Sequence, residues 1–311
     1  MKINLKRTIC MLLTVSMLLS LCIPSSALAT QAAEKEPVFL LLGDSIASGF
    51  GISNPEEACY GRIVADTNHY AYRNLAVMGT DSTELMDAIE TGTVQNPATG
   101  EEITWKDCIR AADIICLSVG ANDFFERPDF TQILVGAISG KTDLLDETAA
   151  LYSGNLRSIL DTVYALNPDA AVIVQTYYCS CRGLAKRVNL AVTDRINAAI
   201  EQFDKEHPGR IHICDISPAM TGKPENLADD CLHPNAKGNV AIAEILLKTL
   251  RDLGLGSETT PVVKVPGQDR NRYMEMYETR AEGVRFTIIM MLLTGNGVNI
   301  LRLIRNTYFK K

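Results

Sequence analysis

The 311-residue chain lacks the features that would remove it from the class of ordinary globular proteins. It has no internal repeat and no low-complexity stretch, and charged residues make up only 22% of it, which excludes a solenoid and a charge-dominated disordered chain. It also has no uninterrupted run of about 20 apolar residues, the length that a membrane-spanning helix needs. We therefore expect one core of roughly 200 residues together with an appended segment.

Basic residues are in deficit over the main part of the chain. The net charge is −7; residues 1–7 contribute +3 and the residues from Lys264 onward contribute +5, which leaves −15 for residues 8–263. Nucleic-acid binding draws on basic surface. The acidic body therefore argues against a nucleic acid as substrate or partner.

The cysteines do not have the spacing of a zinc site. Nine are present, and seven remain once the first 29 residues are set aside, namely Cys59, Cys108, Cys116, Cys179, Cys181, Cys214 and Cys231. An odd number cannot all pair within one chain, so the disulfide pairing stays open. Cys116 lies in an apolar run and is expected to be a small buried hydrophobe.

The N-terminus has the pattern of a secretory signal. Residues 1–7 carry three positive charges, residues 8–23 are mostly apolar, and residues 27–29 read Ala-Leu-Ala, a small-x-small cleavage pattern. We expect cleavage after Ala29 and export, either out of the cell or to the cell envelope. An uncleaved N-terminal anchor is the alternative.

Short apolar runs alternate with helical patterns along the body of the chain. Continuous apolar runs bounded by turn residues are typical of buried parallel strands, and they occur at residues 37–42, 72–77, 111–119, 170–177 and 210–214. Helical patterns lie between and after them, at residues 82–90, 143–166, 183–206 and 236–252. This alternation predicts an α/β protein with a mainly parallel sheet, which would bind its ligand at the carboxyl ends of the strands.

Ser45 is a candidate nucleophile, because it follows the first apolar run in the sequence Gly43-Asp44-Ser45. A serine hydroxyl becomes nucleophilic when a neighbouring base accepts its proton. A sharp turn from a strand into a helix exposes such a serine, and residues 40–49 supply the strand end, the glycine and the helix start. The alternative is a serine that only caps a helix.

His233 is the candidate base, in Asp230-Cys231-Leu232-His233 directly before the last helix of the body. A carboxylate three residues before an imidazole can accept a hydrogen bond from Nδ1–H, which leaves Nε2 free to take a proton. The spacing favours Asp230, with Asp229 as a competitor, and Asn235 is predicted to cap the helix that follows. The other histidines are interpreted as solvent-facing residues: His69, His207 and His212.

An acyl-transfer site also needs hydrogen-bond donors for the oxyanion. The candidates are the backbone N–H groups of Ser45 and Gly79 and the side-chain amide of Asn122. A glycine lets the backbone come close to a ligand, although Gly79 can also be an ordinary turn glycine. Asn122 follows a predicted strand and can likewise be a turn-forming asparagine.

Taken together, these motifs resemble the four sequence blocks of the SGNH (GDSL-type) hydrolase superfamily. The blocks are Gly43-Asp44-Ser45, Gly79, Gly120-x-Asn122-Asp123 and Asp230-x-x-His233, in the family's order over roughly residues 37–252. The resemblance implies a three-layer α/β/α sandwich of flavodoxin-like type with a five-stranded, mainly parallel sheet, and no metal or other cofactor. It implies a Ser45-His233-Asp230 triad and an oxyanion hole made by Ser45, Gly79 and Asn122.

The function that the resemblance implies is that of a secreted serine hydrolase that cleaves acyl esters, lipid or short-chain, through an acyl-enzyme intermediate. A carbohydrate O-acetyl esterase is an alternative, and a non-catalytic envelope binding module is an alternative of another class. The sequence of residues 42–52 resembles the lipase-like branch of the superfamily more than the other branches. Phe124, Phe125 and Phe130 either line an acyl pocket or simply pack. The acyl chain length and the alcohol stay open.

The chain after residue 252 lies outside the family pattern. Residues 254–268 are rich in Gly, Thr, Pro and Ser and are predicted to be a linker. Residues 269–311 are predicted to be a helical tail, with helical patterns at 271–293 and 298–308. This tail is basic and partly apolar, which suits peripheral contact with an anionic membrane, docking on the body or self-association.

Overall fold

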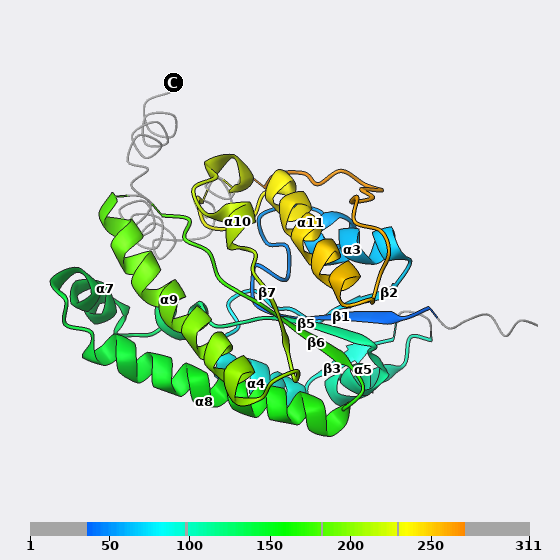
Figure 1. The fold of residues 1–311 in the computed structure, drawn as a ribbon, viewed down its shortest axis with the longest axis horizontal. Coiled ribbons are helices and arrows are strands. Elements are labelled where there is room, and N and C mark those ends of the chain that lie inside the picture. Colours follow the sequence, from blue (N-terminus) through cyan, green and yellow to red (C-terminus); the bar gives the residue numbers. More distant parts are fainter. Residues whose placement is uncertain (1–35, 97–98, 182, 229, 271–311) are drawn as a thin grey trace, which may run out of the picture. The chain divides into compact units, whose positions relative to one another are not determined.

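A five-stranded sheet forms the centre of the protein (Figure 1). The computed structural model describes residues 36–96, 99–181, 183–228 and 230–270, with the backbone alone described at 183–185. The sheet order is β2-β1-β5-β6-β7, and all four strand pairs are parallel. The strands are β1 (Val38–Gly43), β2 (Ala71–Asn74), β5 (Ile114–Ser118), β6 (Ala171–Gln175) and β7 (His212–Cys214). The predicted fold class and strand number are confirmed.

The interior strands β1 and β5 are buried because helices cover both faces of the sheet. Side chains at residues 39–42 of β1 and 114–117 of β5 are at most 2% exposed. This explains why these strands are continuous apolar runs in the sequence rather than alternating ones. Cys116 is among them at 0% exposure, as predicted.

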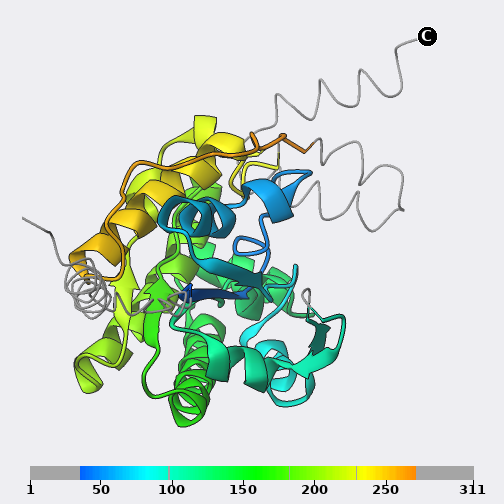
Figure 2. The same ribbon diagram turned by 90° about the vertical axis from the view of Figure 1, so that its right-hand side faces the viewer.

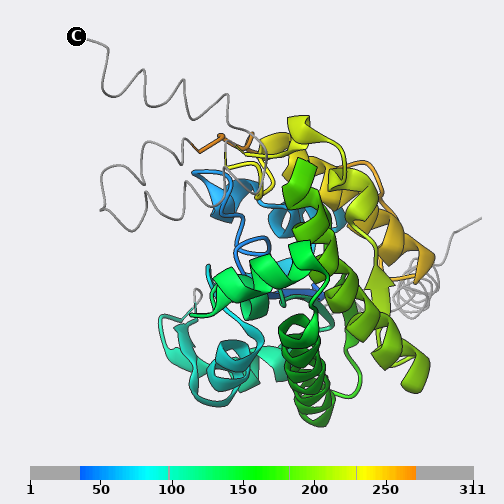
Figure 3. The ribbon, with the colours of Figure 1, turned by 90° about the vertical axis from the view of Figure 1, so that its left-hand side faces the viewer.

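The helices form one layer on each side of the sheet (Figures 1 and 2). Helices α3 (Tyr60–Asn68) and α11 (Ala236–Asp252) pack together on one face. The opposite face is covered by α4 (Ser82–Thr91), α5 (Trp105–Ala111) and α8 (Asp143–Leu166). Helices α7 (Phe130–Ser139) and α9 (Gly183–Glu206) pack beside α8 (Figure 3). The predicted three-layer arrangement is confirmed.

Short elements complete the described fold. They are helices α2 (Pro55–Ala58), α6 (Asn122–Phe125) and α10 (Ser217–Met220), the 3₁₀ turn η1 (Pro224–Asn226), and an antiparallel hairpin of β3 (Thr93–Gln95) and β4 (Glu102–Thr104). Among the described residues, no helix combines the length and the apolar character needed to cross a membrane.

The long helices begin and end at signals that the sequence contains. Helix α8 ends at Leu166, just before Asn167 and Pro168, because a residue that precedes proline is disfavoured in the helical conformation. Helix α11 begins after Asn235, whose side-chain oxygen accepts a hydrogen bond from the Gly238 N–H at 2.8 Å. The predicted cap at Asn235 is therefore confirmed.

The segment predicted to be a linker is hydrogen-bonded along the body. It contains no helix or strand, but the Val262 N–H donates to Thr67 Oγ1 at 2.9 Å and the Lys264 ammonium pairs with Asp66 at 2.9 Å, both on α3. The Ser53 N–H donates to the Gln268 carbonyl oxygen at 2.8 Å. Residues 262–264 thus cover the end of α3, and Gln268 lies against the loop that contains Ser53. The predicted signal at 1–29 and the tail beyond Arg270 lie outside the described residues.

Candidate active site

Ser45 is held in the turn that follows β1. The Asp44 N–H donates to the Ser118 carbonyl oxygen at the end of β5, at 2.9 Å, and the Phe50 N–H donates to the Ser45 carbonyl oxygen at 3.1 Å. These bonds fix the turn at the carboxyl edge of the sheet, where open α/β proteins bind ligands. Ser45 itself is 8% exposed.

His233 lies in a compact loop before α11 that is folded around Asp230. One oxygen of this carboxylate, Oδ1, accepts hydrogen bonds from the Leu232 and His233 N–H groups, both at 2.9 Å. The loop is closed by a hydrogen bond from the Ala228 N–H to the His233 carbonyl oxygen at 2.8 Å. The other carboxylate oxygen is thereby directed at the imidazole of His233.

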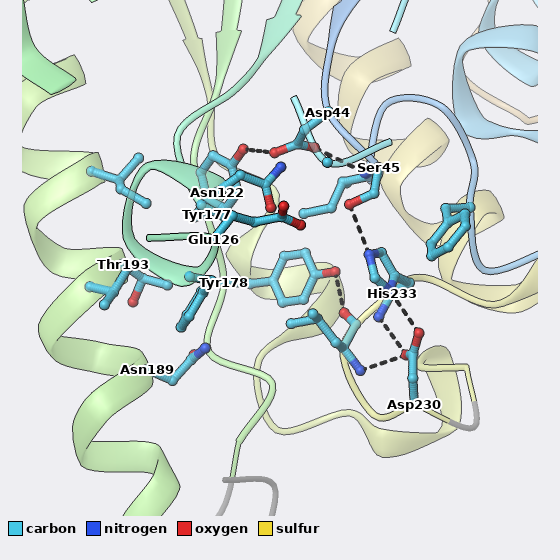
Figure 4. Close-up of a pocket in the computed structure, with 18 of the residues that line it drawn as sticks. Asp44, Ser45, Asn122, Glu126, Tyr177, Tyr178, Asn189, Thr193, Asp230 and His233 are labelled. Atoms are coloured by element: carbon cyan, nitrogen blue, oxygen red, sulfur yellow. Dashed lines mark hydrogen bonds and ion pairs between the residues drawn. The ribbon is translucent and has the colours of Figure 1, made fainter. Parts of the chain in front are cut away.

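The structure brings Ser45, His233 and Asp230 together (Figure 4). His233 Nε2 lies 2.8 Å from Ser45 Oγ, although the two residues are 188 positions apart in the sequence. His233 Nδ1 lies 2.7 Å from Asp230 Oδ2. The competitor Asp229 lies outside the described residues. Of the three histidines interpreted as solvent-facing, His69 is exposed, but His207 and His212 are partly buried, and His207 contacts Arg157.

The environment of Asp230 favours its charged form. Burial raises the pKa of this carboxyl group, but the charge of His233, the hydrogen bond to its ring and two backbone N–H donors together outweigh burial and lower the pKa to about 2. Asp230 is therefore ionised at neutral pH. An ionised partner keeps a proton on Nδ1 and leaves the Nε2 lone pair facing Ser45.

A second loop contact lies beside the imidazole. The ring of Phe50 meets His233 edge-on, with centroids 5.0 Å apart and an interplanar angle of 80°. The next residue, Gly51, is in such close contact that a Cβ atom there would lie 2.1 Å from the Pro234 carbonyl oxygen. Only glycine lets the two loops approach this closely.

The three candidate oxyanion donors border the same cavity. Gly79 has a φ of +83°, a conformation that glycine adopts without strain. The Asn122 amide donates one hydrogen bond to the Thr80 carbonyl oxygen at 2.9 Å, and an amide has a second N–H. Within the described residues, neither the Ser45 N–H nor the Gly79 N–H donates a backbone hydrogen bond.

Asp123, the last residue of the Asn122 block, anchors this block to α4. Its carboxylate accepts hydrogen bonds from the Ser82 N–H at 3.0 Å and from the Ser82 hydroxyl. The Asn155 amide donates to the same hydroxyl at 2.9 Å. Burial raises the pKa of Asp123 to about 6. The bonds to Ser82 tie Asn122 to the segment that carries Gly79.

Asp44 and Tyr177 form a buried pair next to Ser45 that we did not predict. Asp44 Oδ1 accepts the Ile46 N–H at 2.9 Å, and its other oxygen accepts the Tyr177 hydroxyl. Burial raises the pKa of Asp44 to about 6. The one available signal is that Tyr177 follows β6 at the same sheet edge as Ser45.

A cavity of about 460 Å³ opens from Ser45. One wall is helix α9, where Val188, Val192 and Ile196 recur every fourth residue and are at most 1% exposed. The remaining apolar side chains come from several loops and from α6: Ile46, Phe50, Met78, Ala121, Phe125, Tyr177, Tyr178, Cys181 and Leu232. The four-residue spacing on α9 predicts a buried face of this helix, but it does not show that the face borders a cavity.

The three phenylalanines considered for an acyl pocket differ in their positions. Phe125 lines the cavity, whereas Phe124 is fully buried in the core. Phe130 packs against Phe125 with ring centroids 5.6 Å apart. One of the three therefore faces the cavity and the others support it.

Two polar side chains interrupt the apolar wall of α9. Asn189 and Thr193 are 4% and 5% exposed, one helical turn apart (Figure 4). Asn189 Oδ1 is buried without a hydrogen-bond partner, which typically costs about 1–3 kcal/mol.

Among the described residues no cluster of three or more His, Cys, Asp or Glu side chains is arranged to hold a metal ion.

Comparison with known proteins agrees with this architecture. A sequence model of the GDSL-like Lipase/Acylhydrolase family matches residues 41–241. The uncharacterized protein YpmR of Bacillus subtilis (strain 168) is 24% identical over 234 residues, which cover 71% of this chain and 84% of that protein.

Two solved structures share the fold. The lipase Lip_vut3 from a goat rumen metagenome has a TM-score of 0.53 at 17% identity, over 71% of this chain and 98% of that one. A family two carbohydrate esterase from Clostridium thermocellum has a TM-score of 0.51 at 14% identity, over 71% and 65%. The family match spans well over half of the sequence. The chain therefore belongs to the GDSL-like lipase/acylhydrolase family, and this membership supports an ester hydrolase.

Proposed function

We propose that the protein is a serine ester hydrolase in which Ser45 is the nucleophile, His233 the general base and Asp230 the residue that orients His233. The observation that carries this proposal is the continuous hydrogen-bonded chain from Asp230 through His233 to the Ser45 hydroxyl, with distances of 2.7 and 2.8 Å. Membership in the acylhydrolase family supports the same reaction class.

In the acylation step, Ser45 Oγ attacks the ester carbonyl carbon while its proton passes to His233 Nε2. The carbonyl oxygen becomes an oxyanion that faces the Ser45 N–H, the Gly79 N–H and the Asn122 amide. The ionised Asp230 stabilises the imidazolium. The bond to the alcohol oxygen then breaks, and this oxygen takes the proton from His233 Nε2.

In the deacylation step, water takes the place of the alcohol. His233 Nε2 accepts a proton from this water as it attacks the acyl carbon, and the same donors stabilise the second oxyanion. The bond to Ser45 Oγ breaks, and the proton returns from His233 to the serine. The acid leaves and the starting state of the site is restored.

The cavity wall favours an acyl group with an alkyl chain. Each methylene that moves from water to an apolar surface contributes about 0.8 kcal/mol, and the α9 face offers such a surface next to Ser45. We therefore infer that the substrate is a lipid or other acyl ester. A carbohydrate O-acetyl esterase is the second candidate, because Asn189 and Thr193 offer hydrogen bonds that suit sugar hydroxyls.

The location that goes with this function is outside the cell or at the cell envelope. We infer it from residues 1–29, whose charged start, apolar middle and Ala-Leu-Ala sequence have the pattern of a secretory signal. Peripheral membrane contact or self-association through residues 269–311 would suit a lipid substrate, and it belongs to the same proposal.

The test is to replace Ser45 with alanine in the full chain and to assay p-nitrophenyl butyrate. We expect kcat to fall by at least about 10⁴-fold with an unchanged circular dichroism spectrum, because Ser45 is the only hydroxyl within the described residues that lies against His233 Nε2. Ser158→Ala, on the surface of α8, is the matched control and should retain full activity. Turnover that is undiminished in Ser45→Ala would refute the proposal.

A panel of substrates then separates the two candidates. Wild-type protein is assayed on p-nitrophenyl esters of increasing chain length, on lysophospholipid and on acetylated xylan. The acyl-ester proposal expects kcat/KM to rise from the acetyl to the octanoyl ester. A preference for acetylated xylan would support the O-acetyl esterase instead.

A further inference from the structure

Residues 266–270, called the strap from here on, cross two loops of the candidate active site. The first is the nucleophile loop, residues 46–54, which follows Ser45. The second is the histidine loop, residues 230–235, which contains Asp230 and His233. The strap belongs to the part of the chain that lies beyond the family match.

The strap is bonded to the nucleophile loop through backbone and side chain. The Ser53 N–H donates to the Gln268 carbonyl oxygen, and the Gln268 N–H donates to Asn54 Oδ1, both at 2.8 Å. The Arg270 N–H donates to the Gly51 carbonyl oxygen at 3.2 Å. These bonds hold residues 51–54, the second half of the nucleophile loop.

Asp269 connects the strap to the histidine loop. Its Oδ1 accepts the Ala236 N–H at 2.9 Å, and Ala236 is the first residue of α11, directly after that loop. A carboxylate at a helix N-terminus is favoured by the unpaired N–H groups there. The backbone of Asp269 forms an antiparallel bridge with Ile52. Asp269 thus lies between the two loops: its side chain accepts a bond from the start of α11, and the backbone bonds of its neighbours Gln268 and Arg270 hold the nucleophile loop.

The loops that the strap joins are in contact next to the reacting atoms. Gly51 meets the Pro234 carbonyl oxygen, and Phe50 meets the His233 ring edge-on. The guanidinium of Arg270 lies 5.2 Å from the Phe50 ring centroid, within the range of a cation–π contact. A shift of one loop against the other would therefore change the distance from Ser45 Oγ to His233 Nε2.

We propose that Asp269 is a positioning residue, which holds the nucleophile loop against the histidine loop and so keeps Ser45 within hydrogen-bond reach of His233. This inference rests on the proposed function, because it concerns the geometry of the same two side chains. Asp269 touches neither the substrate nor the reacting atoms and acts through Ala236 and Ile52.

The experiment compares four full-length variants. Asp269→Ala removes the acceptor for the Ala236 N–H, and Asp269→Asn keeps an acceptor oxygen. Asn54→Ala removes the side-chain bonds of Asn54 to the strap and leaves the two backbone bonds between the nucleophile loop and the strap in place. Lys264→Gln breaks a surface ion pair with Asp66 farther along the same segment and is the matched control. For each protein, the rate of Ser45 labelling by a fluorophosphonate and the kcat and KM for p-nitrophenyl butyrate are measured well below the unfolding midpoint.

We expect Asp269→Ala to lower both the labelling rate and kcat by about 10-fold with little change in KM, because misplacement of reacting groups costs rate rather than ground-state binding. Asn54→Ala should change both in the same direction. Asp269→Asn should regain most of the activity, and Lys264→Gln should equal wild type. A structural role alone would lower the fraction of active protein and not the labelling rate of the folded fraction.

Two outcomes would overturn the inference while the proposed function stands. In one, wild type labels and hydrolyses the ester, and both Asp269→Ala and Asn54→Ala do so at the wild-type rate. In the other, Lys264→Gln loses as much activity as Asp269→Ala. A wild-type protein that neither labels nor hydrolyses the ester would overturn the proposed function, and this inference with it.

Discussion

Asp44 and Asp230 are two buried carboxyl groups next to the reacting side chains with opposite pKa shifts. Burial raises the pKa of Asp44 from 3.8 to about 6, so its contribution to stability is complete below about pH 4 and is lost as the pH rises through 6. The pKa of Asp230 is lowered to about 2, so its contribution is present above about pH 4 and is lost as the pH falls toward 2.

Replacing Asp44 with asparagine should separate these two effects. Asparagine keeps an acceptor for the Ile46 N–H but cannot ionise. Relative to wild type, the free energy of unfolding of Asp44→Asn should therefore increase between pH 4 and pH 8, by up to roughly 3 kcal/mol. Denaturant unfolding at pH 4, 6 and 8 measures it. Asp161→Asn on the surface is the control, and a difference that is independent of pH would contradict the burial argument.

Sequence separation decides which of these side-chain pairs could be predicted. Asp230 and His233 are three residues apart, so one local motif contains both partners. Asp44 and Tyr177 are 133 residues apart, and no local pattern links them. The contact between Ser45 and His233 was predictable despite its 188-residue separation, because the family resemblance supplied the link that the residues alone do not.

Helix α9 presents Val192 and its neighbours to the cavity, so we expect it to affect which substrates the protein accepts. Val192→Phe should fill part of this space. We expect kcat/KM for p-nitrophenyl octanoate to fall at least about 10-fold relative to the acetate, with a stability loss of about 1–3 kcal/mol from overpacking. Ala198→Phe, on the exposed face of α9, is the control. Equal losses of kcat/KM on both esters would show that the acyl chain of the substrate does not bind along α9.

The long helices were predicted with their bounds, whereas α3, α5, α7 and the β3–β4 hairpin were not. Helices α8, α9 and α11 have amphipathic patterns of 17 to 24 residues with clear start or stop signals. Helix α3 is nine residues long and buries polar residues such as Asp66 and Thr67. They are buried because residues 262–264 cover them, almost 200 positions later in the chain, and this contact has no local signal.

At the scale of the whole molecule, residues 256–270 act as part of the folded body. A variant that ends at Leu255 would lack the strap and would also lose the hydrogen bonds from residues 262 and 264 to α3. At about 0.5–1.5 kcal/mol for each net hydrogen bond, we expect a loss of at least about 3 kcal/mol and a melting temperature lower by roughly 6–12 °C than that of a chain ending at Arg270. Thermal unfolding followed by circular dichroism measures the difference. Equal midpoints for the two chains would mean that the segment contributes no stability.

The distance between Ser45 and His233 along the chain also has a consequence for biosynthesis. A ribosome completes the serine and its strand long before the imidazole, which arrives 188 residues later. Until the last crossover has folded back onto the sheet, the nascent polypeptide carries an ordinary alcohol with no proton acceptor beside it. The protein would then hydrolyse esters only after the last part of the chain has folded. In a translation reaction, the time at which esterase activity appears would report when the polypeptide is complete.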